Sequence, residues 1–271
     1  MSCHEYIMES PDEIKRLEMK TDFAALERQA LWAGLAPGMR VADIGCGSGI
    51  TTEFLKRLTG PSGEVVGIDQ SEERLAFAGQ YHGGEGISFA RRDIYGSLEG
   101  LGGFDFIWVR FLLEYHRSRQ FELVQKLAGL LNPGGILCLV DLDFNSINHA
   151  GWTGRLKQAV EASVACLETR ADFDPYAGKR LYGHVYDLGL EEIQVKVETH
   201  HLIYGELKGV DSFNWLTKVV TACRESGYSF SEYPGGFEEF YQECRTFFSD
   251  PRRFTYTPLI VCRGVKPFPE T

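Results

Sequence analysis

Several features that would point to a membrane, secreted or disulfide-rich protein are missing from this sequence. The longest apolar runs, FDFIWV and GILCLV, are far shorter than the ~20 residues that a membrane-spanning helix needs. The N-terminus, MSCHEYIMESPDE, is acidic, whereas a secretory signal begins with basic residues and continues with an apolar stretch. We therefore expect no membrane partner and a cytoplasmic location.

The cysteines lack the spacing that is typical of disulfide frameworks and zinc sites. The seven cysteines are an odd number, and none forms a C-x-x-C pair. A disulfide framework and a compact zinc site are both unexpected, so we predict no metal site.

Positive charge is also in short supply. The 28 Lys and Arg residues face 38 Asp and Glu residues, which gives a formal net charge of -10. The resulting field repels nucleic acid, so a small molecule or a protein is the expected substrate. The length of 271 residues and a hydrophobic content of 44% fit one α/β domain, 1–271, with insertions better than two complete domains.

The stretch Val41 to Gly49, VADIGCGSG, is the strongest local signal. It predicts a buried strand that ends in a glycine turn, and the following ITTEFLKRL predicts a helix. A dinucleotide fingerprint would need its third glycine where Ile50 stands, and a P-loop would need a lysine at the helix start. Both phosphate-binding patterns are therefore disfavoured.

A ligand without phosphates fits this turn better. Its carboxylate and ribose would lie over the glycines, and Asp43 would pair with an ammonium group, which describes S-adenosylmethionine. VADIGCGSG resembles motif I of the class I methyltransferases, in which an acid and G-x-G-x-G hold the methionine part of this cofactor. The candidate cofactor-binding residues of this stretch are Asp43, Gly45, Cys46, Gly47 and Gly49.

Two further acids follow in the order that this family shows. EVVGID predicts a second strand, and its last residue, Asp69, lies 20 residues beyond Gly49, the spacing of an acid that binds ribose hydroxyls. Gln70 is placed beside it in the site. After a third strand, ISFA, the resemblance implies that Asp93 accepts a hydrogen bond from the adenine amino group and that Ile94 packs on the ring, although Asp93 is equally compatible with a simple turn.

A fourth strand, FDFIWV, brings Arg110 and the residues after it to the place where the methyl group would lie. LLNPGGILCLVDLD then looks like the L-x-P-G-G-x-L signature before the fifth strand of the same family. These features together resemble the class I methyltransferases over a cofactor-binding core, 40–143. In general character, though not in a specific motif, the sequence also resembles the quinone and natural-product C- and O-methyltransferases. An N-terminal pair of cap helices, 10–33, contains Arg16, which is either a partner for the methionine carboxylate or a solvated charge.

The resemblance implies a three-layer, doubly wound, Rossmann-like α/β fold with seven mostly parallel strands. Strand seven, which includes Ile260 to Arg263, is expected to be antiparallel and to insert between strands five and six. Two helical inserts, 145–178 and 211–250, would form a lid. Their many aromatic residues fit either a substrate pocket or the core of the inserts themselves.

The leading hypothesis is direct, in-line methyl transfer to a small molecule, because the chain shows no nucleophile of its own. As catalytic residues we consider His116 or His149, as a general base or to polarise the acceptor, and Arg110, to orient the substrate. The alternatives are a non-catalytic S-adenosylmethionine-binding protein, a nicotinamide-dependent oxidoreductase, and arsenic methylation through Cys166, Cys223 and Cys244. The acceptor, the methylated atom and the oligomeric state remain open.

Overall fold

Strands and helices alternate along the first half of the chain, as the hydrophobic pattern predicts. The computed structural model describes residues 21–207, 215–216, 219 and 221–269. In the cofactor half the elements are α2 (Phe23–Ala33), β1 (Arg40–Ile44), α3 (Ile50–Thr59), β2 (Glu64–Asp69), α4 (Glu72–Tyr81), β3 (Ile87–Arg91), β4 (Phe104–Arg110), the short 3₁₀ helix η1 (Leu113–Tyr115), α5 (Gln120–Gly129) and β5 (Leu131–Leu142). The rest of the chain adds β6 (His149–Ala150), α6 (Gly154–Arg170), α7 (Ala177–Asp187), β7 (Glu191–Tyr204), α9 (Gly236–Ser249) and β8 (Phe254–Val265).

The strands form one sheet in the order β3-β2-β1-β4-β5-β8, with both β7 and the two-residue β6 paired to β8. β8 runs antiparallel to β5 and to β7, while the first five strands are parallel to their neighbours. The predicted insertion of the last strand between strands five and six is confirmed. Residues 149–150 add an eighth strand that the hydrophobic pattern did not predict, since two residues carry no period.

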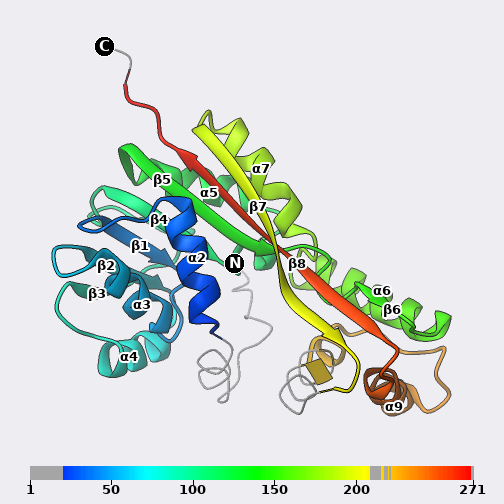
Figure 1. Cartoon of the computed structure of the whole chain (residues 1–271). Coiled ribbons are helices and arrows are strands. Elements are labelled where there is room, and N and C mark those ends of the chain that lie inside the picture. The colour runs from blue at the N-terminus through cyan, green and yellow to red at the C-terminus, as the bar shows by residue number, and fades with distance from the viewer. Residues whose placement is uncertain (1–20, 208–214, 217–218, 220, 270–271) are drawn as a thin grey trace.

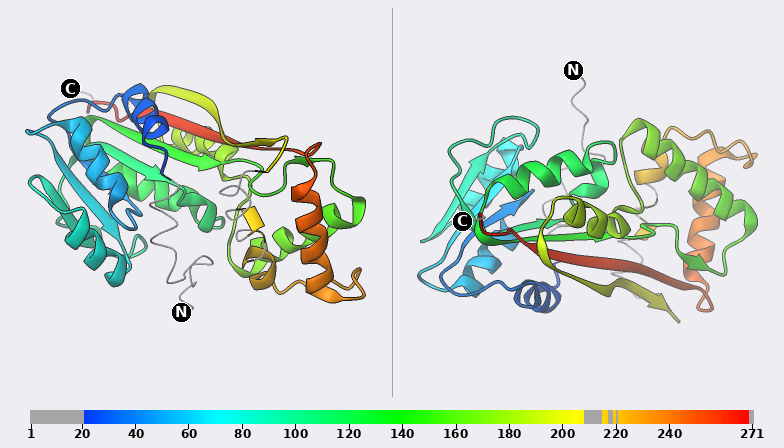
Figure 2. Two further views of the ribbon diagram at one scale, coloured as in Figure 1. Left: turned by 60° about the horizontal axis from the view of Figure 1, so that its bottom comes forward. Right: turned by 90° about the horizontal axis from the view of Figure 1, so that it is seen from above.

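Helices cover both faces of this sheet, so the three-layer prediction is confirmed (Figure 2). Side chains of β4 alternate between two cores: Phe106 and Trp108 pack with α2 and α3, whereas Ile107 and Val109 pack with α5 and α7. All four are essentially inaccessible to solvent. A strand that is buried on both faces explains why FDFIWV reads as a continuous apolar run.

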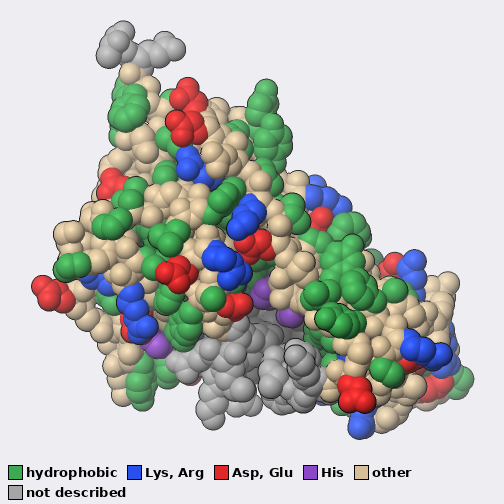
Figure 3. All heavy atoms as spheres, viewed as in Figure 1, with side chains coloured by type: hydrophobic (Ala, Val, Ile, Leu, Met, Phe, Trp, Pro, Cys, Tyr) green, Lys and Arg blue, Asp and Glu red, His purple; other side chains and the backbone are tan. Residues whose placement is uncertain are grey.

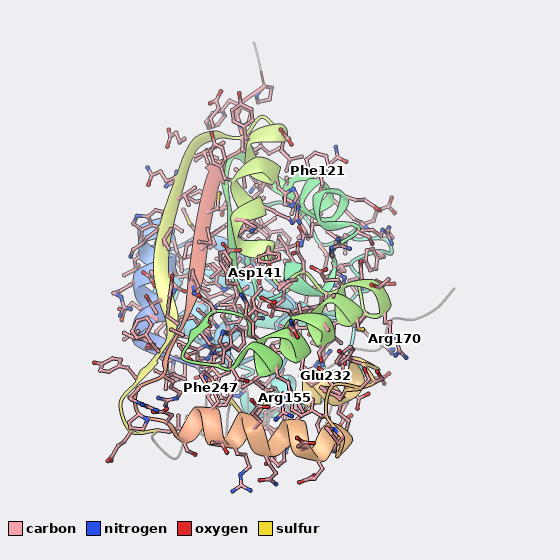
Figure 4. The ribbon with its side chains drawn as sticks, turned by 90° about the vertical axis from the view of Figure 1, so that its right-hand side faces the viewer. Phe121, Asp141, Arg155, Arg170, Glu232 and Phe247 are labelled. Atoms are coloured by element: carbon pink, nitrogen blue, oxygen red, sulfur yellow. The ribbon has the colours of Figure 1, made fainter. Side chains whose placement is uncertain are left out.

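β7 and β8 continue beyond the parallel part of the sheet as a long two-stranded ribbon (Figure 1). The far end of the ribbon supports a second group of helices, here called the helical lobe, which comprises α6, α9 and the described residues 215–216, 219 and 221–230. The lobe has its own aromatic core, which includes Trp215, Phe240 and Phe248. Figure 4 shows Arg155 of α6 between the two helices, where it pairs with Glu239 and Glu243 of α9.

The outer side of the ribbon exposes apolar side chains, which gather over β7 and β8 in Figure 3. Leu202 and Tyr204 on β7 and Phe254 and Tyr256 on β8 are all at least 40% exposed. Val195 and Val197, which alternate with polar residues along β7, are likewise exposed, so much of the apolar face of this strand is turned to solvent.

Local contacts set several element boundaries. Gly34 ends α2 in a left-handed conformation, and residues 10–20 with Arg16, part of the predicted cap helices, lie outside the described part. α5 begins at Gln120, two residues after Ser118, whose amide and hydroxyl both donate to Asp172 of the first insert. The NPGG segment lies within β5, where Gly134 and Gly135 exchange backbone hydrogen bonds with Lys266. No helix in the described ranges is long and apolar enough to cross a membrane.

Two glycines of α7 provide a test of how tightly this helix packs on the sheet. A Cβ atom on Gly178 would lie 2.9 Å from the carbonyl oxygen of Asp141 and 2.8 Å from a side-chain carbon of Ile260, whereas one on Gly183 would meet no atom within 4 Å. Gly178→Ala should lower the free energy of unfolding by about 1–3 kcal/mol through overpacking. Gly183→Ala, the control on the exposed side, should raise it by up to ~1 kcal/mol through helix propensity. Urea unfolding of both variants measures the difference, and equal effects would contradict this packing.

Candidate functional site

The glycine turn lies where β1, β2 and β4 end side by side. Gly45, Gly47 and Gly49 all have positive φ, at 73°, 54° and 85°, a region that side chains with a Cβ rarely adopt. Gly49 is also pressed against α4 and β3, because a Cβ there would lie 2.7 Å from that of Ala78 and 3.0 Å from the ring of Phe89. The first residues of α3 are thereby held next to the strand ends, beside the crevice in which α/β sheets bind ligands.

A cavity of about 310 Å³ opens at these strand ends. One half is formed by the predicted cofactor residues and their neighbours, which include Asp43, Gly45, Cys46, Gly47, Asp69, Gln70, Ile94 and Arg110. The other half is formed mainly by elements after β4, including Tyr115, Asn145, Ser146, Val164, Leu167, Phe173, His200, His201 and Ala222. The cavity is thus continuous from the glycine turn to the helical inserts.

Asp43 is the buried acid of this cavity. Its carboxylate accepts a hydrogen bond from the Thr52 hydroxyl at 2.7 Å. Burial raises the pKa of Asp43 from 3.8 to about 7, even though the Thr52 hydrogen bond and the Arg110 charge act to lower it. A cationic group that enters the cavity beside Asp43 would therefore stabilise the carboxylate form of this residue, which burial disfavours.

Asp69 ends β2 and links it to the glycine turn. One of its carboxylate oxygens accepts from the amide of Gly47 at 3.0 Å, and the other accepts from the amide of Ser71 at 2.9 Å. Arg74 of α4 forms an ion pair with the same carboxylate at 3.2 Å. Because Asp69 lines the cavity while it holds the turn, substitutions of this residue change both the site and its support.

Arg110 brings a buried cation to the end of β4. Burial lowers the pKa of its guanidinium to about 10, against the charges of Asp43, Asp22 and Asp141, which act to raise it. The guanidinium lies 4.1 Å from the centre of the Phe111 ring. Phe111 itself has a φ of 54°, an unusual value for a bulky residue, and such strain is concentrated at functional sites in proteins.

The predicted adenine end of the cavity is bounded by Ile94, Tyr95 and His116. The Tyr95 hydroxyl and Nδ1 of His116 share a hydrogen bond of 2.7 Å. Asp93 is exposed, accepts a hydrogen bond from the amide of Tyr95, and is not among the described lining residues. Of the two residues predicted here, Ile94 therefore lines the cavity and Asp93 does not.

Two buried carboxyl groups face each other beneath the cavity. The amide of Glu114 donates to Asp141, and Asn145 donates to the Glu114 side chain at 2.5 Å. Burial, together with the neighbouring Glu114, raises the pKa of Asp141 well above its usual range. Glu114 lines the cavity, whereas neither Asp141 nor Asp143 does so among the described residues.

His149 lies in the helical lobe and not in the described lining of this cavity. Its ring is hydrogen-bonded to Thr255 at 2.7 Å and to the carbonyl of Ser146 at 3.2 Å. Aromatic rings of Trp152 and Trp215 lie 4.7 and 5.4 Å from the imidazole. Most of the aromatic residues noted in the inserts likewise fill the core of the lobe, and of that set Phe173 lines the cavity.

The cysteines considered for arsenic chemistry are not brought to the cavity. Cys223 and Cys244 are buried in the core of the lobe, and Cys166 is half-buried on α6. Burial raises the pKa of the Cys223 thiol to about 12, which suppresses the thiolate that binds metals and metalloids. No group of three or more metal-ligating side chains occurs in the described ranges.

Two adjacent histidines of β7, His200 and His201, were missed in the sequence analysis, although both line the cavity. Apolar residues alternate along their strand, and such a pattern gives no reason to place two neighbouring imidazoles on one face. The HH pair in a predicted strand was the available signal. Tyr115 and Phe173, with ring centres 6.0 Å apart, complete this half of the cavity.

Comparisons with known proteins agree with this geometry. A family model described as "Methyltransferase domain" matches residues 41–135. The trans-aconitate 2-methyltransferase of Variovorax paradoxus is 32% identical over 63% of this chain and 62% of its own length. The juvenile hormone acid O-methyltransferase of Bombyx mori is 36% identical over 63% of this chain and 63% of its own.

The fold likeness covers more of the chain than these sequence matches. The structure of phosphoethanolamine N-methyltransferase 2 of Haemonchus contortus, solved with S-adenosyl-L-methionine, matches 90% of this chain and 53% of that one, with a TM-score of 0.55 and 16% identity. Further solved structures of similar TM-score share the same α/β fold. Residues 41–135 thus match a methyltransferase domain, the chain spans less than two thirds of the length of these two relatives, and the comparisons together support the class I S-adenosylmethionine-dependent methyltransferase family.

S-adenosylmethionine is the cofactor of this family, and the residues present fit it. The buried Asp43 suits its ammonium group, and the buried Arg110 suits its carboxylate. The family assignment gives no support to the nicotinamide alternative, which also lacked the required glycine spacing.

The raised pKa of Asp43 predicts a pH dependence of cofactor binding. An ammonium group beside Asp43 favours the carboxylate, so binding should release a proton wherever the free protein is protonated at this site. Affinity for S-adenosylhomocysteine should then fall as the pH drops below about 7, by up to about tenfold per pH unit. Calorimetry between pH 5.5 and 8 measures this slope, and Asp43→Asn, which cannot titrate, is the control. A slope shared by both proteins would contradict the assignment.

Proposed function

We propose that this protein transfers the methyl group of S-adenosylmethionine to a small-molecule acceptor by direct in-line attack. The observation that supports this best is the continuous cavity, which joins the cofactor residues at the glycine turn to an apolar, histidine-containing half. Methyl transfer from a sulfonium needs chiefly the alignment of two reactants in one enclosed site, and such a cavity provides it.

The relatives support a small acceptor. The names trans-aconitate 2-methyltransferase and juvenile hormone acid O-methyltransferase describe enzymes that act on small molecules. The net charge of -10 also disfavours nucleic acid as a substrate. The cytoplasmic location stays a prediction.

We assign roles to this chain's residues as follows. Asp43 holds the ammonium group, Asp69 accepts from the ribose hydroxyls, and Ile94 packs on the adenine. Arg110 pairs with the carboxylate of the cofactor. Binding the cofactor is therefore its main role, and orienting the acceptor is a secondary one. Residues of the two inserts, among them Val164, Leu167 and Ala222, enclose the acceptor and exclude water.

A general base at His116 or His149 stays a prediction. His149 is enclosed in the aromatic core of the lobe, and His116 is bonded to Tyr95 at the adenine end. His116 itself lines the cavity next to Tyr115, whereas His149 reaches it through Ser146, which lines the apolar half.

The proposed function is tested first by binding and then by turnover. Calorimetry should show that S-adenosylmethionine and S-adenosylhomocysteine bind and that NAD does not. Mass spectrometry with methyl-labelled cofactor and a panel of small phenols, acids, amines and thiols then detects transfer. Absence of cofactor binding would refute the proposal, and binding without transfer to any acceptor would favour the non-catalytic alternative.

The ribose assignment has its own variant. Asp69→Asn keeps the size of the side chain but removes the charge that strengthens hydrogen bonds from the ribose hydroxyls, so affinity for S-adenosylhomocysteine should fall about tenfold or more. Glu72→Gln removes an equal charge from an exposed position three residues away and should change affinity less than about twofold. Calorimetry on the two variants decides, and unchanged affinity in Asp69→Asn would refute the role.

A further inference from the structure

Two consecutive histidines on β7 point into the same cavity, which an ordinary strand does not allow. Along a regular strand neighbouring side chains point to opposite faces. In β7 the pairing with β8 shifts between Thr199, opposite Pro258, and His201, opposite Thr257, so that His200 is an extra residue in a β-bulge. A bulge of this kind re-aims side chains and is common beside active sites.

The neighbours of β7 confirm which face is involved. Before the bulge, Lys196 lies over Trp32 of α2, and Glu198 accepts a hydrogen bond from Gln29 of the same helix at 2.8 Å. After the bulge, Ile203 is buried in the core of the helical lobe. The inward positions therefore change from even to odd numbers at the bulge, and both His200 and His201 face inward.

The pair bridges the two halves of the cavity. The ring of His200 lies 5.0 Å from that of Phe111, the residue after Arg110 at the end of β4. The ring of His201 lies 4.2 Å from His200 and 5.1 Å from Trp215 of the lobe. His200 is thus near the predicted cofactor residues, and His201 lies between His200 and Trp215 of the helical lobe.

The chemistry around the pair selects the kind of acceptor. Tyr115, Val164, Leu167, Phe173 and Ala222 form an apolar lining suited to an apolar or aromatic body. An ammonium group has no free electron pair to attack the methyl carbon and would be repelled by Arg110, while a carboxylate is already anionic and needs no base. A phenol, with a pKa of about 10 as in tyrosine, carries a proton that imidazole can remove as the oxygen is alkylated.

We propose that His200 and His201 form the proton-accepting site for a small phenolic or enolic acceptor whose oxygen is methylated. This proposal rests on the proposed methyltransferase function. The acceptor oxygen forms its bond to the methyl carbon while the carbon–sulfur bond breaks and its electron pair returns to sulfur. The hydroxyl proton passes to an imidazole nitrogen, and the imidazolium later releases it to water.

The placement of the pair is testable without knowing the acceptor. S-adenosylmethionine and S-adenosylhomocysteine differ by one methyl group and one positive charge at sulfur, so they act as a matched probe of distance from the reacting centre. Imidazole titrations followed by NMR on protein labelled with ¹⁵N-histidine should show a pKa lower by about half a unit or more with S-adenosylmethionine for His200, for His201 or for both. His184, which bonds to Gln120 on the opposite face, is the internal control and should not differ.

Other charged groups also lie in the cavity and influence the pKa values of the two histidines. They are Asp43 from β1, Asp69 from β2, Arg74 from α4, Arg92 after β3, Arg110 from β4, Glu114 from η1 and the titratable His116 after η1. Because both complexes contain the same protein groups, the comparison of the two cofactors isolates the effect of the sulfonium charge. Equal pKa values for both histidines in the two complexes would overturn the placement. If neither cofactor binds, the proposed function fails instead, so the two failures are distinct.

The acceptor class is tested with one scaffold that carries a hydroxyl, an amine or a carboxyl group, namely 4-butylphenol, 4-butylaniline and 4-butylbenzoic acid. The proposal expects the phenol to be methylated fastest. His200→Gln or His201→Gln should lower its single-turnover rate about a hundredfold and abolish the acidic limb of the pH profile, with cofactor affinity unchanged. Thr199→Gln, on the exposed face, should leave both intact. Preference for the aniline or the acid, no methylation of the phenol, or rates within a few-fold of the parent in both histidine variants would each overturn the assignment.

Discussion

The backbone pairing of β8 between β5 and β7 is the constraint on which the rest of the molecule depends. β8 joins the parallel sheet at its β5 side, and its other end carries the ribbon to the helical lobe. Since β7 pairs with β8 along almost its whole length, the histidines at the bulge and the lobe beyond it are fixed relative to the strand ends. The position of β8 therefore determines where the apolar, histidine-containing half of the cavity lies.

Charge is distributed unevenly along that cavity. Asp43 and Arg110 are both buried at the glycine turn, where desolvation raises the pKa of the acid and lowers that of the base. Each therefore gains from a ligand that brings an opposite charge, and a zwitterionic amino acid group brings both. The acceptor half has fewer formal charges and more rings, which suits a neutral reactant whose charge changes only during the reaction.

The sequence allowed the cofactor half to be predicted because its signals are local. The strand and turn of VADIGCGSG and the acid Asp69 at its fixed spacing all act within about thirty residues, and each lies where it was expected. The acceptor half could not be predicted in this way. Val164, His201 and Ala222 meet only because of the ribbon and the lobe, and the aromatic residues of the inserts gave no means of telling a core from a pocket lining. The extra residue at His200 breaks the period of two on which strand prediction rests.

Hydrogen bonds attach the first insert to the core at residues other than Val164 and Leu167. The amide of Arg117 donates to the carbonyl of Asp172, and the amide of Asp174 donates to the carbonyl of Glu114. Ser118 and Gln120 of the core also donate to the carboxylates of Asp172 and Asp174. The insert can therefore exchange its cavity-facing residues, such as Val164 and Leu167, while it stays docked in the same position. The residues that hold the cofactor are therefore separate from the residues of the insert that face the cavity. During evolution, substitutions in the insert can change the preferred substrate without displacing the cofactor-binding residues.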